Sequence, residues 1–531
     1  MITNITLWKS LRSIAVALFT IHCSLFTSVA LTSCSDWLDV SPKAQIKAED
    51  NFSAEQGYKD ALTGVYLQMA STSTYGQELT YGMLDAMAQY YTAMATNNTY
   101  RYDAAFDYAN SAVESRINAL WQQMYTTIAN CNELISRIDA ADAATFTGRN
   151  YYLIRGEAYG LRALMHFDLV RLWGEPYAKN PHHQCIPYMT QVTSDVLPLV
   201  TVDEALTRCL ADLSIAEAAL AVDPVVASAP ASASATDFTF TASSSFAAGT
   251  TPDSNYERNR TFKMNYYAVC MLQARIHLYR GNYAEALAAA RKVINQQTFY
   301  FTPDAEINVA ESAQRNRIFA EELVFALYDS GLRSRYSTYF TTDNQTSLIM
   351  SEQSYQAVYE LFTPGFSGDY RFAYQTQELD GKYHSTKYMQ PAGGNTNYMF
   401  RLPMMRLSEA YYIAAECELK LNHNASEALK LLNTVRSHRN LTDPLTAATA
   451  SESTAGSTAE QQVMDEIWKE YVKEFMGEGQ LYFFYKRLNY EQIPIPTALG
   501  NTVSYTYVVP NYVFPLPDDE VEYGGRKDLS F

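Results

Sequence analysis

Apolar residues at helical spacing constrain the fold of this 531-residue chain more than any other feature of its sequence. Within residues 121–135 and 153–172, large apolar side chains recur every three or four positions, which is the period of an amphipathic helix. The first stripe contains Trp121, Met124, Tyr125, Ile128, Cys131 and Ile135, and the second contains Leu153, Ala158, Leu161, Met165, Leu169 and Leu172. We therefore expect helices to form most of the structure.

A pair of consecutive helices is repeated along the sequence. Helical runs that end near Tyr279 and Leu421 are each followed closely by a Glu-Ala-Leu element. A third such element follows the run that ends near Leu172, after a longer insertion, and there Thr201 and Glu204 have the spacing of a capping box. Stacked helix pairs bury a continuous core. The sequence thus predicts a tetratricopeptide-like helical-repeat scaffold, with repeats around residues 115–220, 262–296 and 404–440.

Strand-like and low-complexity segments are few. Alternating or continuous apolar character indicates strands only at residues 503–509 and 323–327. Residues 227–255 and 446–460 are dominated by Ala, Ser and Thr without an apolar period, which is typical of surface loops. The expected fold is therefore mainly α, with an irregular, loop-rich part and few short strands.

The amino terminus has the features of an export signal. Lys9 and Arg12 precede a run without charged residues at positions 13–33, and the run ends in Leu-Thr-Ser before Cys34. This ending is similar to the bacterial lipobox, in which the cysteine carries the lipid. We predict a lipoprotein signal peptide over residues 1–33, lipidation of Cys34, and a single body over residues 34–531. A run of about 20 residues can also remain as a membrane anchor, but no basic cluster follows this one.

Charge and cysteine content exclude several classes of protein. The net charge of −17 argues against nucleic acid as a partner, because such binding depends on Lys and Arg displacing counterions. Most of the five cysteines that follow Cys34 lie at apolar positions of helical patterns, so we expect buried thiols rather than disulfides. The chain has no Cys-x-x-Cys pair, and we expect neither a metal site nor a cofactor.

Motifs that carry catalysis are missing from the sequence. It contains no His-Glu-x-x-His, no Gly-x-Ser-x-Gly and no Walker loop. Glu474 and Glu478 are one helical turn apart, whereas glycoside hydrolysis needs two carboxylates across a cleft at about 5–10 Å. We expect this pair to be solvated or salt-bridged, and a surface loop at His182-His183. The chain is therefore predicted not to be an enzyme.

Charged residues inside the helical patterns have a structural interpretation. Arginines and glutamates at matching places predict buried ion pairs that fix helix packing. The residues concerned are Arg162, Arg406 and Arg436, alongside Glu157, Glu409 and Glu416.

Two clusters of aromatic and polar residues are candidates for ligand binding. A sugar presents C–H faces and hydroxyl edges, so it needs exposed aromatic rings beside hydrogen-bonding side chains. The clusters fall within residues 75–110 and 328–400, which we expect to be loops, the second cluster following the strand-like segment. The candidates are Tyr90, Tyr91, Asn98, Tyr100, Arg101 and Tyr102 in the first region, and Tyr336, Tyr339, Phe340 and Asn344 in the second. The competing interpretation is that these tyrosines fill half-buried helix faces.

Several blocks occur in an order that resembles the SusD/RagB family of nutrient-uptake outer-membrane lipoproteins of Bacteroidetes. They extend from Cys34 to the C-terminus, and the block at 402–410 looks like the most recognisable helix of that family. The blocks are Ser35-Asp36-Trp37-Leu38-Asp39 with Pro42, Arg155-Gly156-Glu157-Ala158, Leu172-Trp173-Gly174-Glu175-Pro176, Leu402-Pro403-Met404-Met405-Arg406-Leu407-Ser408-Glu409-Ala410, Glu474-Phe475-Met476-Gly477-Glu478-Gly479 and Phe514-Pro515-Leu516-Pro517.

This resemblance implies a lipid-anchored, surface-exposed binding protein of the outer membrane without catalytic activity. It would capture oligosaccharide and deliver it to a SusC-like TonB-dependent transporter, with the helical repeats facing the transporter. The family keeps ligand-binding aromatics in places similar to the two clusters above, and Asp36 resembles the acidic signals for surface export. Three alternatives stay open: a peptide-binding member of the same family, a surface glycosidase, and a helical adaptor without a small ligand.

Overall fold

The computed structural model describes residues 51–227, 256–447 and 458–526. The signal peptide, Cys34, Asp36 and most of the two Ala/Ser/Thr-rich segments lie outside the described residues. Residues 1–57 and 58–531 form two separate compact units, and everything reported below on the site belongs to the second.

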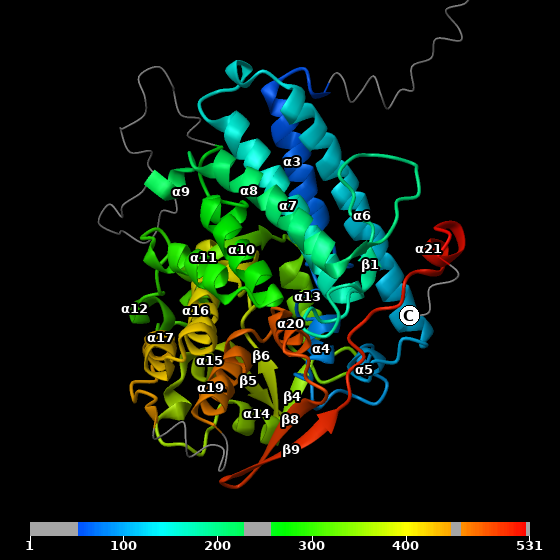
Figure 1. The fold of residues 1–531 in the computed structure, drawn as a ribbon. Helices are drawn as coiled ribbons and strands as arrows, with labels where there is room; N and C mark the ends of the chain where they lie inside the picture. The colour runs from blue at the N-terminus through cyan, green and yellow to red at the C-terminus, as the bar shows by residue number, and fades with distance from the viewer. Residues whose placement is uncertain (1–50, 228–255, 448–457, 527–531) are drawn as a thin grey trace, which may run out of the picture. The chain divides into compact units, whose positions relative to one another are not determined.

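Helices dominate the described residues, which confirms the expected mainly α fold (Figure 1). The longer helices are α3 (Glu55–Met69), α6 (Ser111–Ala140), α7 (Asn150–Trp173), α8 (Val202–Leu220), α10 (Tyr266–Arg280), α11 (Tyr283–Asn295), α16 (Leu407–Asn422), α17 (Ala425–Ser437), α19 (Ala459–Glu474) and α20 (Gln480–Arg487). The shorter ones are α4 (Met83–Met87), α5 (Arg101–Ala104), α9 (Pro224–Ala227), α12 (Asp304–Ile307), α13 (Leu332–Tyr339), α14 (Glu352–Val358), α15 (Tyr370–Gln375) and α21 (Asp518–Tyr523). Helix α19 begins inside the segment 446–460 that the sequence predicts as a loop.

Consecutive helices pack as pairs at the places where the sequence shows its repeated pattern. Helix α7 packs on α8, α10 on α11 and α16 on α17, and α11 also packs on α16, so the pairs form a stack. Gly281 ends α10 with φ +75°, a left-handed conformation that glycine adopts without a steric penalty. Thr201 caps α8 as the capping-box spacing predicts, because its Oγ1 accepts a hydrogen bond from the Glu204 N–H at 3.1 Å, whereas the Glu204 carboxylate bonds Arg208.

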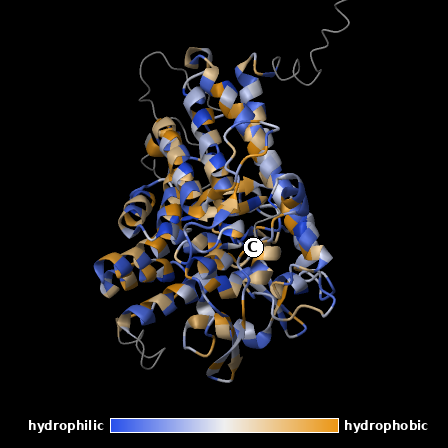
Figure 2. Ribbon diagram, turned by 45° about the vertical axis from the view of Figure 1, so that its right-hand side comes forward, coloured by the Kyte–Doolittle hydropathy of each residue, from blue (hydrophilic) through white to orange (hydrophobic). Residues whose placement is uncertain are grey.

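The core lies where these helices meet. Figure 2 shows hydrophobic and hydrophilic residues alternating along most helices, with the hydrophobic ones gathered toward the interior. Helix α7 differs, because it is buried on all sides over most of its length from Leu153 to Trp173. Its polar side chains therefore require partners inside the protein.

Four small antiparallel sheets lie within the described part of the chain. Their strands are β1 (Gln184–Ile186) with β2 (Val200–Thr201), β3 (Leu323–Tyr328) with β7 (Arg401–Arg406), β8 (Ile493–Leu499) with β9 (Thr502–Val508), and β4 (Ile349–Ser351), β6 (Lys382–Ser385) and β5 (Thr376–Leu379) in that order. The two segments with strand-like sequence are confirmed as β3 and β9. Strand β8, which pairs with β9 along its whole length, was not expected.

Two local expectations are wrong. The block at 402–410 is a strand as far as Arg406, and α16 begins only at Leu407, because residues 401–406 pair with β3. The residues around Tyr336, expected in a loop, form helix α13 instead. In both cases long-range contacts decide a structure that local sequence leaves open.

The expected buried ion pairs exist, but with other partners. Arg162 pairs with Asp212, Arg406 with Glu478 and Arg436 with Glu470. The three glutamates named with them pair with arginines on other elements, namely Glu157 with Arg260, Glu409 with Arg275 and Glu416 with Arg487. Each of these side chains therefore pairs with a residue on another element of the fold.

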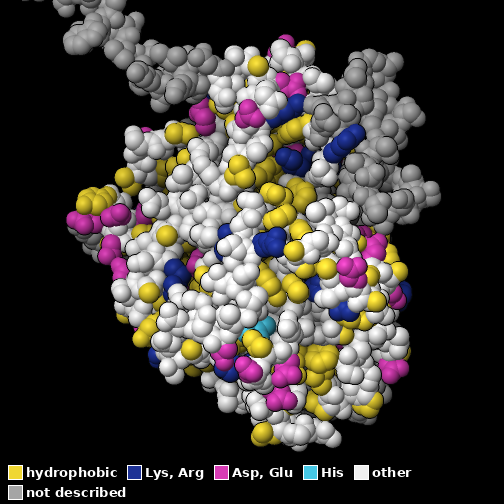
Figure 3. Space-filling model, turned by 180° about the vertical axis from the view of Figure 1, so that it is seen from behind, with side chains coloured by type: hydrophobic (Ala, Val, Ile, Leu, Met, Phe, Trp, Pro, Cys, Tyr) yellow, Lys and Arg dark blue, Asp and Glu magenta, His cyan; other side chains and the backbone are white. Residues whose placement is uncertain are grey.

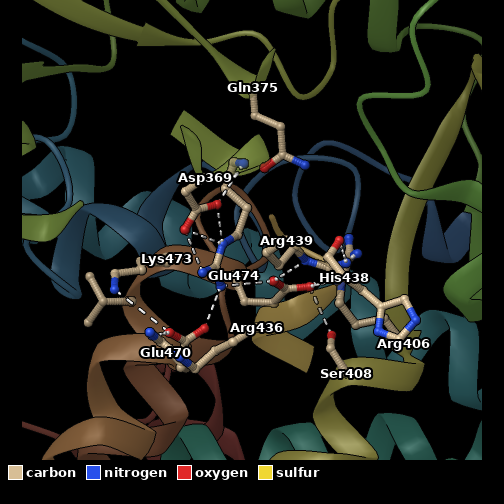
Figure 4. A network of polar contacts seen from close by, with 12 residues as sticks. Asp369, Gln375, Arg406, Ser408, Arg436, His438, Arg439, Glu470, Lys473 and Glu474 are labelled. Carbon is tan, nitrogen blue, oxygen red and sulfur yellow. Dashed lines mark hydrogen bonds and ion pairs between the residues drawn. The ribbon is translucent and has the colours of Figure 1, made fainter. Parts of the chain in front are cut away.

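The largest network of this kind joins β7, α15, α17 and α19 (Figure 4). Arg439 bonds Glu474 and Glu322 at 2.6 Å each, and Arg371 bonds Glu470 at 2.8 Å. Burial alone would raise the pKa of Glu474, but Arg439 and the neighbouring arginines hold that pKa well below its usual range. Glu474 is thus a charged, structural residue.

The cysteines behave as expected, since Cys131, Cys185, Cys209, Cys270 and Cys417 are all buried and free. Across the described ranges, no group of three or more His, Cys, Asp or Glu side chains has a geometry suited to a metal ion. In the same ranges, every helix is too short or too polar to cross a bilayer.

Candidate functional site

The two clusters predicted to bind ligand meet in the fold although about 240 residues separate them. Asn98 Nδ2 donates to the Ser347 carbonyl at 2.9 Å, and Gln77 Nε2 donates to the Tyr339 hydroxyl at 3.0 Å. The Tyr339 ring lies 6.0 Å from that of Tyr81 and 6.4 Å from that of Tyr100. These contacts join the turn-rich chain around α4 and α5 to helix α13 and the chain that follows it.

Two adjoining hollows mark this junction. The first, of about 350 Å³, is lined by Thr72, Ser73, Gln77, Glu78, Arg116, Ala119, Arg335, Thr338 and Tyr339. The second, of about 540 Å³, is lined by Ala95, Asn97, Asp343, Asn344, Gln345 and Thr346. A hydrogen bond from Thr346 Oγ1 to the Thr338 carbonyl connects their walls. We call the two hollows together the junction site.

Six of the ten predicted ligand residues are buried rather than exposed at the junction site. Tyr90 is 2% exposed and its hydroxyl donates to the Val472 carbonyl at 2.8 Å, while the Tyr91 hydroxyl donates to the Tyr81 carbonyl at 2.6 Å. The others are Asn98, Tyr100, Tyr336 and Phe340. For these six, the structure favours the competing interpretation, in which aromatic and amide groups support the fold from inside.

The remaining four residues are accessible. Tyr102 is 37% exposed, and the Arg101 guanidinium lies 4.9 Å from the centre of its ring. Tyr339 is half-buried and lines the first hollow, and Asn344 is exposed in the second. A ligand can reach all four side chains, but Arg101 and Tyr102 line neither hollow, so only Tyr339 and Asn344 belong to the junction site.

The first hollow also contains charged residues that sequence analysis did not select. Arg116 on α6 bonds the buried carboxylate of Asp103, and Arg335 Nε donates to the Tyr81 hydroxyl at 3.0 Å. Glu78 accepts hydrogen bonds from the Tyr100 hydroxyl at 3.1 Å and from the Met83 N–H at 3.2 Å. Glu78 and Gln77 lie within the predicted region 75–110, but they have no periodic pattern that distinguishes them.

Burial controls the protonation of Glu78. Removal from water raises the pKa of Glu78 to about 7, against the opposing effect of the nearby Arg116 charge. Near neutral pH this carboxyl therefore changes between a hydrogen-bond donor and an acceptor. It is the only carboxyl group that lines the first hollow.

The junction site combines aromatic rings with amide, hydroxyl and guanidinium groups. Such a surface can stack on the C–H faces of a sugar and bond its hydroxyl edges. The glutamate pair considered for hydrolysis lies elsewhere and is tied into ion pairs, as expected: Glu474 with Arg439, and Glu478 with Arg406 and Lys387. However, α19 ends at Glu474, so Glu478 is not on the same helix face.

Charge at the surface is mixed. On the face shown in Figure 3, basic side chains lie scattered among acidic, hydrophobic and uncharged ones instead of forming a continuous stripe. This face therefore lacks the basic track that binding to a phosphate backbone requires.

Comparison with known proteins identifies relatives at low sequence identity. The chain is 22% identical over 457 residues to SusD-like protein P2 of Formosa agariphila, covering 78% of this chain and 80% of that protein. It is 21% identical over 310 residues to SusD-like protein P25 of the same organism, and the match spans 57% of this chain and half of that relative's length.

Solved structures share the fold. A SusD superfamily protein from Bacteroides thetaiotaomicron superposes with a TM-score of 0.63 at 21% identity, covering 89% of this chain and 98% of that one. A SusD-like carbohydrate binding protein from Bacteroides vulgatus gives 0.62 at 18% identity, with 89% and 97% covered.

Family models cover nearly the whole described body. Residues 36–241 match a model described as starch-binding proteins associating with the outer membrane. Residues 237–522, more than half of the chain, match the model of the SusD family. The chain belongs to the SusD family.

Proposed function

We propose that this protein is a cell-surface lipoprotein that captures oligosaccharide at the junction site and passes it to a SusC-like TonB-dependent transporter. The observation that carries the proposal is the meeting of two distant aromatic and polar segments around adjoining hollows. The matched starch-binding model and the carbohydrate binding relative from Bacteroides vulgatus support the choice of ligand. The protein acts by binding and breaks no bond in the ligand.

The accessible residues of the junction site have distinct roles in this proposal. Tyr339 offers a ring face for stacking, and Asn344 offers an amide that both donates and accepts hydrogen bonds. Gln77 and Arg335 add donors next to Tyr339. The buried tyrosines support these side chains from inside the protein.

Delivery of ligand requires a place at the membrane and a partner there. We propose that lipid on Cys34 tethers the body to the outer membrane, with its helical repeats turned toward the transporter. The family model that matches residues 36–241 describes proteins associated with that membrane, which supports this location.

Calorimetry on the full chain in detergent tests the choice of ligand. The titrants are maltoheptaose, cellohexaose, laminarihexaose and xylohexaose, with a mixture of short peptides as the competing class. We expect one oligosaccharide to bind and the double variant Tyr339→Ala, Asn344→Ala to weaken that binding about tenfold or more, which is a loss of about 1.4 kcal/mol. The control is Tyr152→Ala, which removes a tyrosine that is 46% exposed on α7, outside the site.

The outcomes separate the alternatives. Binding of peptides and not of oligosaccharides would replace the ligand class while keeping the site. Release of reducing ends during the titration would show a glycosidase. If the double variant binds with wild-type affinity, the ligand binds outside the junction site.

A further inference from the structure

A larger hollow lies elsewhere in the second unit, between α14, α19 and the β8–β9 hairpin. Its volume is about 920 Å³, within the range of small-molecule sites. Its walls include Phe362, Asp443, Trp468, Lys469, Tyr505 and Tyr507, and it shares no lining residue with the junction site. We call it the hairpin groove.

Three aromatic rings form a row along the hairpin groove. Tyr505 and Tyr507 occupy alternate positions on β9, so their side chains point to the same face of the hairpin. Their ring centres are 6.4 Å apart, and the Trp468 ring lies 6.3 Å from that of Tyr505. Tyr505 is 41% exposed and Tyr507 is 56% exposed, so both rings are available for stacking. Exposed tyrosines on a short hairpin contribute little to a core, and their exposure favours a binding role.

Both basic side chains that line the hairpin groove are already paired with carboxylates. Lys469 bonds Glu360 at 3.0 Å and Glu466 at 2.9 Å, and Arg436 bonds Glu470 at 2.9 Å. An anionic ligand would have to compete with these ion pairs. An uncharged ligand leaves them intact and gains from the aromatic row.

The hydrogen-bond acceptors in the groove favour one of two kinds of uncharged ligand. The carboxylate of Asp443 lines the groove beside proline and carboxamide side chains, and a carboxylate only accepts hydrogen bonds. A sugar hydroxyl donates to such an acceptor. Proline-rich peptides also dock on aromatic grooves, but proline has no N–H to donate.

We propose that the hairpin groove is a second binding site for neutral oligosaccharide, independent of the junction site. Sugar rings stack on the row formed by Trp468, Tyr505 and Tyr507, and their hydroxyls bond the polar side chains along its edges. The proposal rests on the proposed function for the class of ligand, and it adds a second place where that ligand binds.

Calorimetry with the same four oligosaccharides and with decaproline tests this site in the full chain in detergent. The groove variant is Tyr505→Ala, Tyr507→Ala, and the junction variant is Tyr339→Ala, Asn344→Ala. The matched control is Tyr523→Ala on α21, where the removed tyrosine is 72% exposed and outside both sites. We expect two binding events in the wild type. The groove variant should weaken one of them about tenfold, leaving the other and the unfolding temperature unchanged.

Each outcome decides the proposal. If the junction variant abolishes all binding and the groove variant changes nothing, the second site is wrong while the proposed function stands. If only the groove variant loses binding, the hairpin groove is right and the junction site is wrong. Decaproline binding that the groove variant abolishes, without saccharide binding there, overturns the ligand class. Failure of every oligosaccharide to bind the wild type overturns both proposals.

Discussion

Single residues show which part of the site can be found from sequence. Tyr102 lies in the short helix α5 and Asn344 in irregular chain, and both are accessible in the structure. Tyr90 looks the same in sequence, yet it is buried because its hydroxyl reaches Val472, which is 382 positions away. Composition selects the residue types for binding, whereas burial depends on contacts that no local pattern contains.

Glu78 gives a prediction about pH. Its folded-state pKa of about 7 lies above the value of about 4.5 for an exposed glutamate, so the folded state holds the proton more tightly than the unfolded state. The stability that Glu78 contributes is therefore full below pH 4.5 and falls as the pH rises through 7. Compared with wild type, Glu78→Gln should gain about 2–3 kcal/mol of unfolding free energy between pH 5 and pH 8.

Urea unfolding of both proteins at pH 5, 6, 7 and 8 measures this gain. Other groups that titrate in this range affect both proteins equally and cancel in the comparison. The control is Glu491→Gln, which removes an exposed carboxyl group outside the site. A difference between Glu78→Gln and wild type that stays constant with pH would mean that Glu78 is charged throughout the range.

At the scale of elements, the helix pairs follow from local signals. Thr201 caps α8 through a group three residues away, and Gly281 supplies the left-handed turn between α10 and α11. The partners of Arg162 and Arg406 did not follow, because each pairs with a residue on another element at least 50 positions away. Capping is local chemistry, whereas the pairing of helices is decided by the whole fold.

Two glycine substitutions test the turn between α10 and α11. Gly281→Ala should cost about 1 kcal/mol, because φ is +75° and a side chain is disfavoured there although no atom blocks the added Cβ. Gly64→Ala in α3 also meets no atom within 4 Å, but there alanine favours the helix and should stabilise it by up to about 1 kcal/mol. Denaturant midpoints of the two variants should therefore move in opposite directions. If both variants lose stability, contacts of the added methyl groups decide the result and not backbone conformation.

The network around Glu474 predicts the cost of breaking a buried ion pair between elements. Glu474→Gln leaves Arg439 and Arg371 with less compensation and should cost about 3–5 kcal/mol in unfolding free energy. Glu427→Gln, in the exposed pair with Lys430, should cost less than about 1 kcal/mol. Chemical denaturation measures both. Similar small losses would show that water screens the network around Glu474.

At the scale of the whole molecule, the sequence predicted the family and the class of fold, and the comparisons confirmed the family. The ordered blocks allowed this, since each is short but their order extends over the whole body. The ordered blocks do not predict the ligand class, because in our proposals it depends on a few side chains at the junction site and the hairpin groove. A scaffold of stacked helix pairs tolerates change in such segments, so relatives with the same fold can hold different ligands.

The proposed membrane attachment concerns the molecule as a whole, and it leads to a prediction about Cys34. If Cys34 carries the lipid, cells grown with an alkyne-labelled palmitate should incorporate the label into the wild type and not into Cys34→Ala. Each acyl methylene buried in the bilayer contributes about 0.8 kcal/mol, so the modified chain should pellet with membranes. Cys23→Ala, which changes a cysteine within the predicted signal peptide, should keep the label. Labelling that survives Cys34→Ala would place the lipid elsewhere, and an unlabelled wild type that still pellets would favour the apolar run at 13–33 as a permanent anchor.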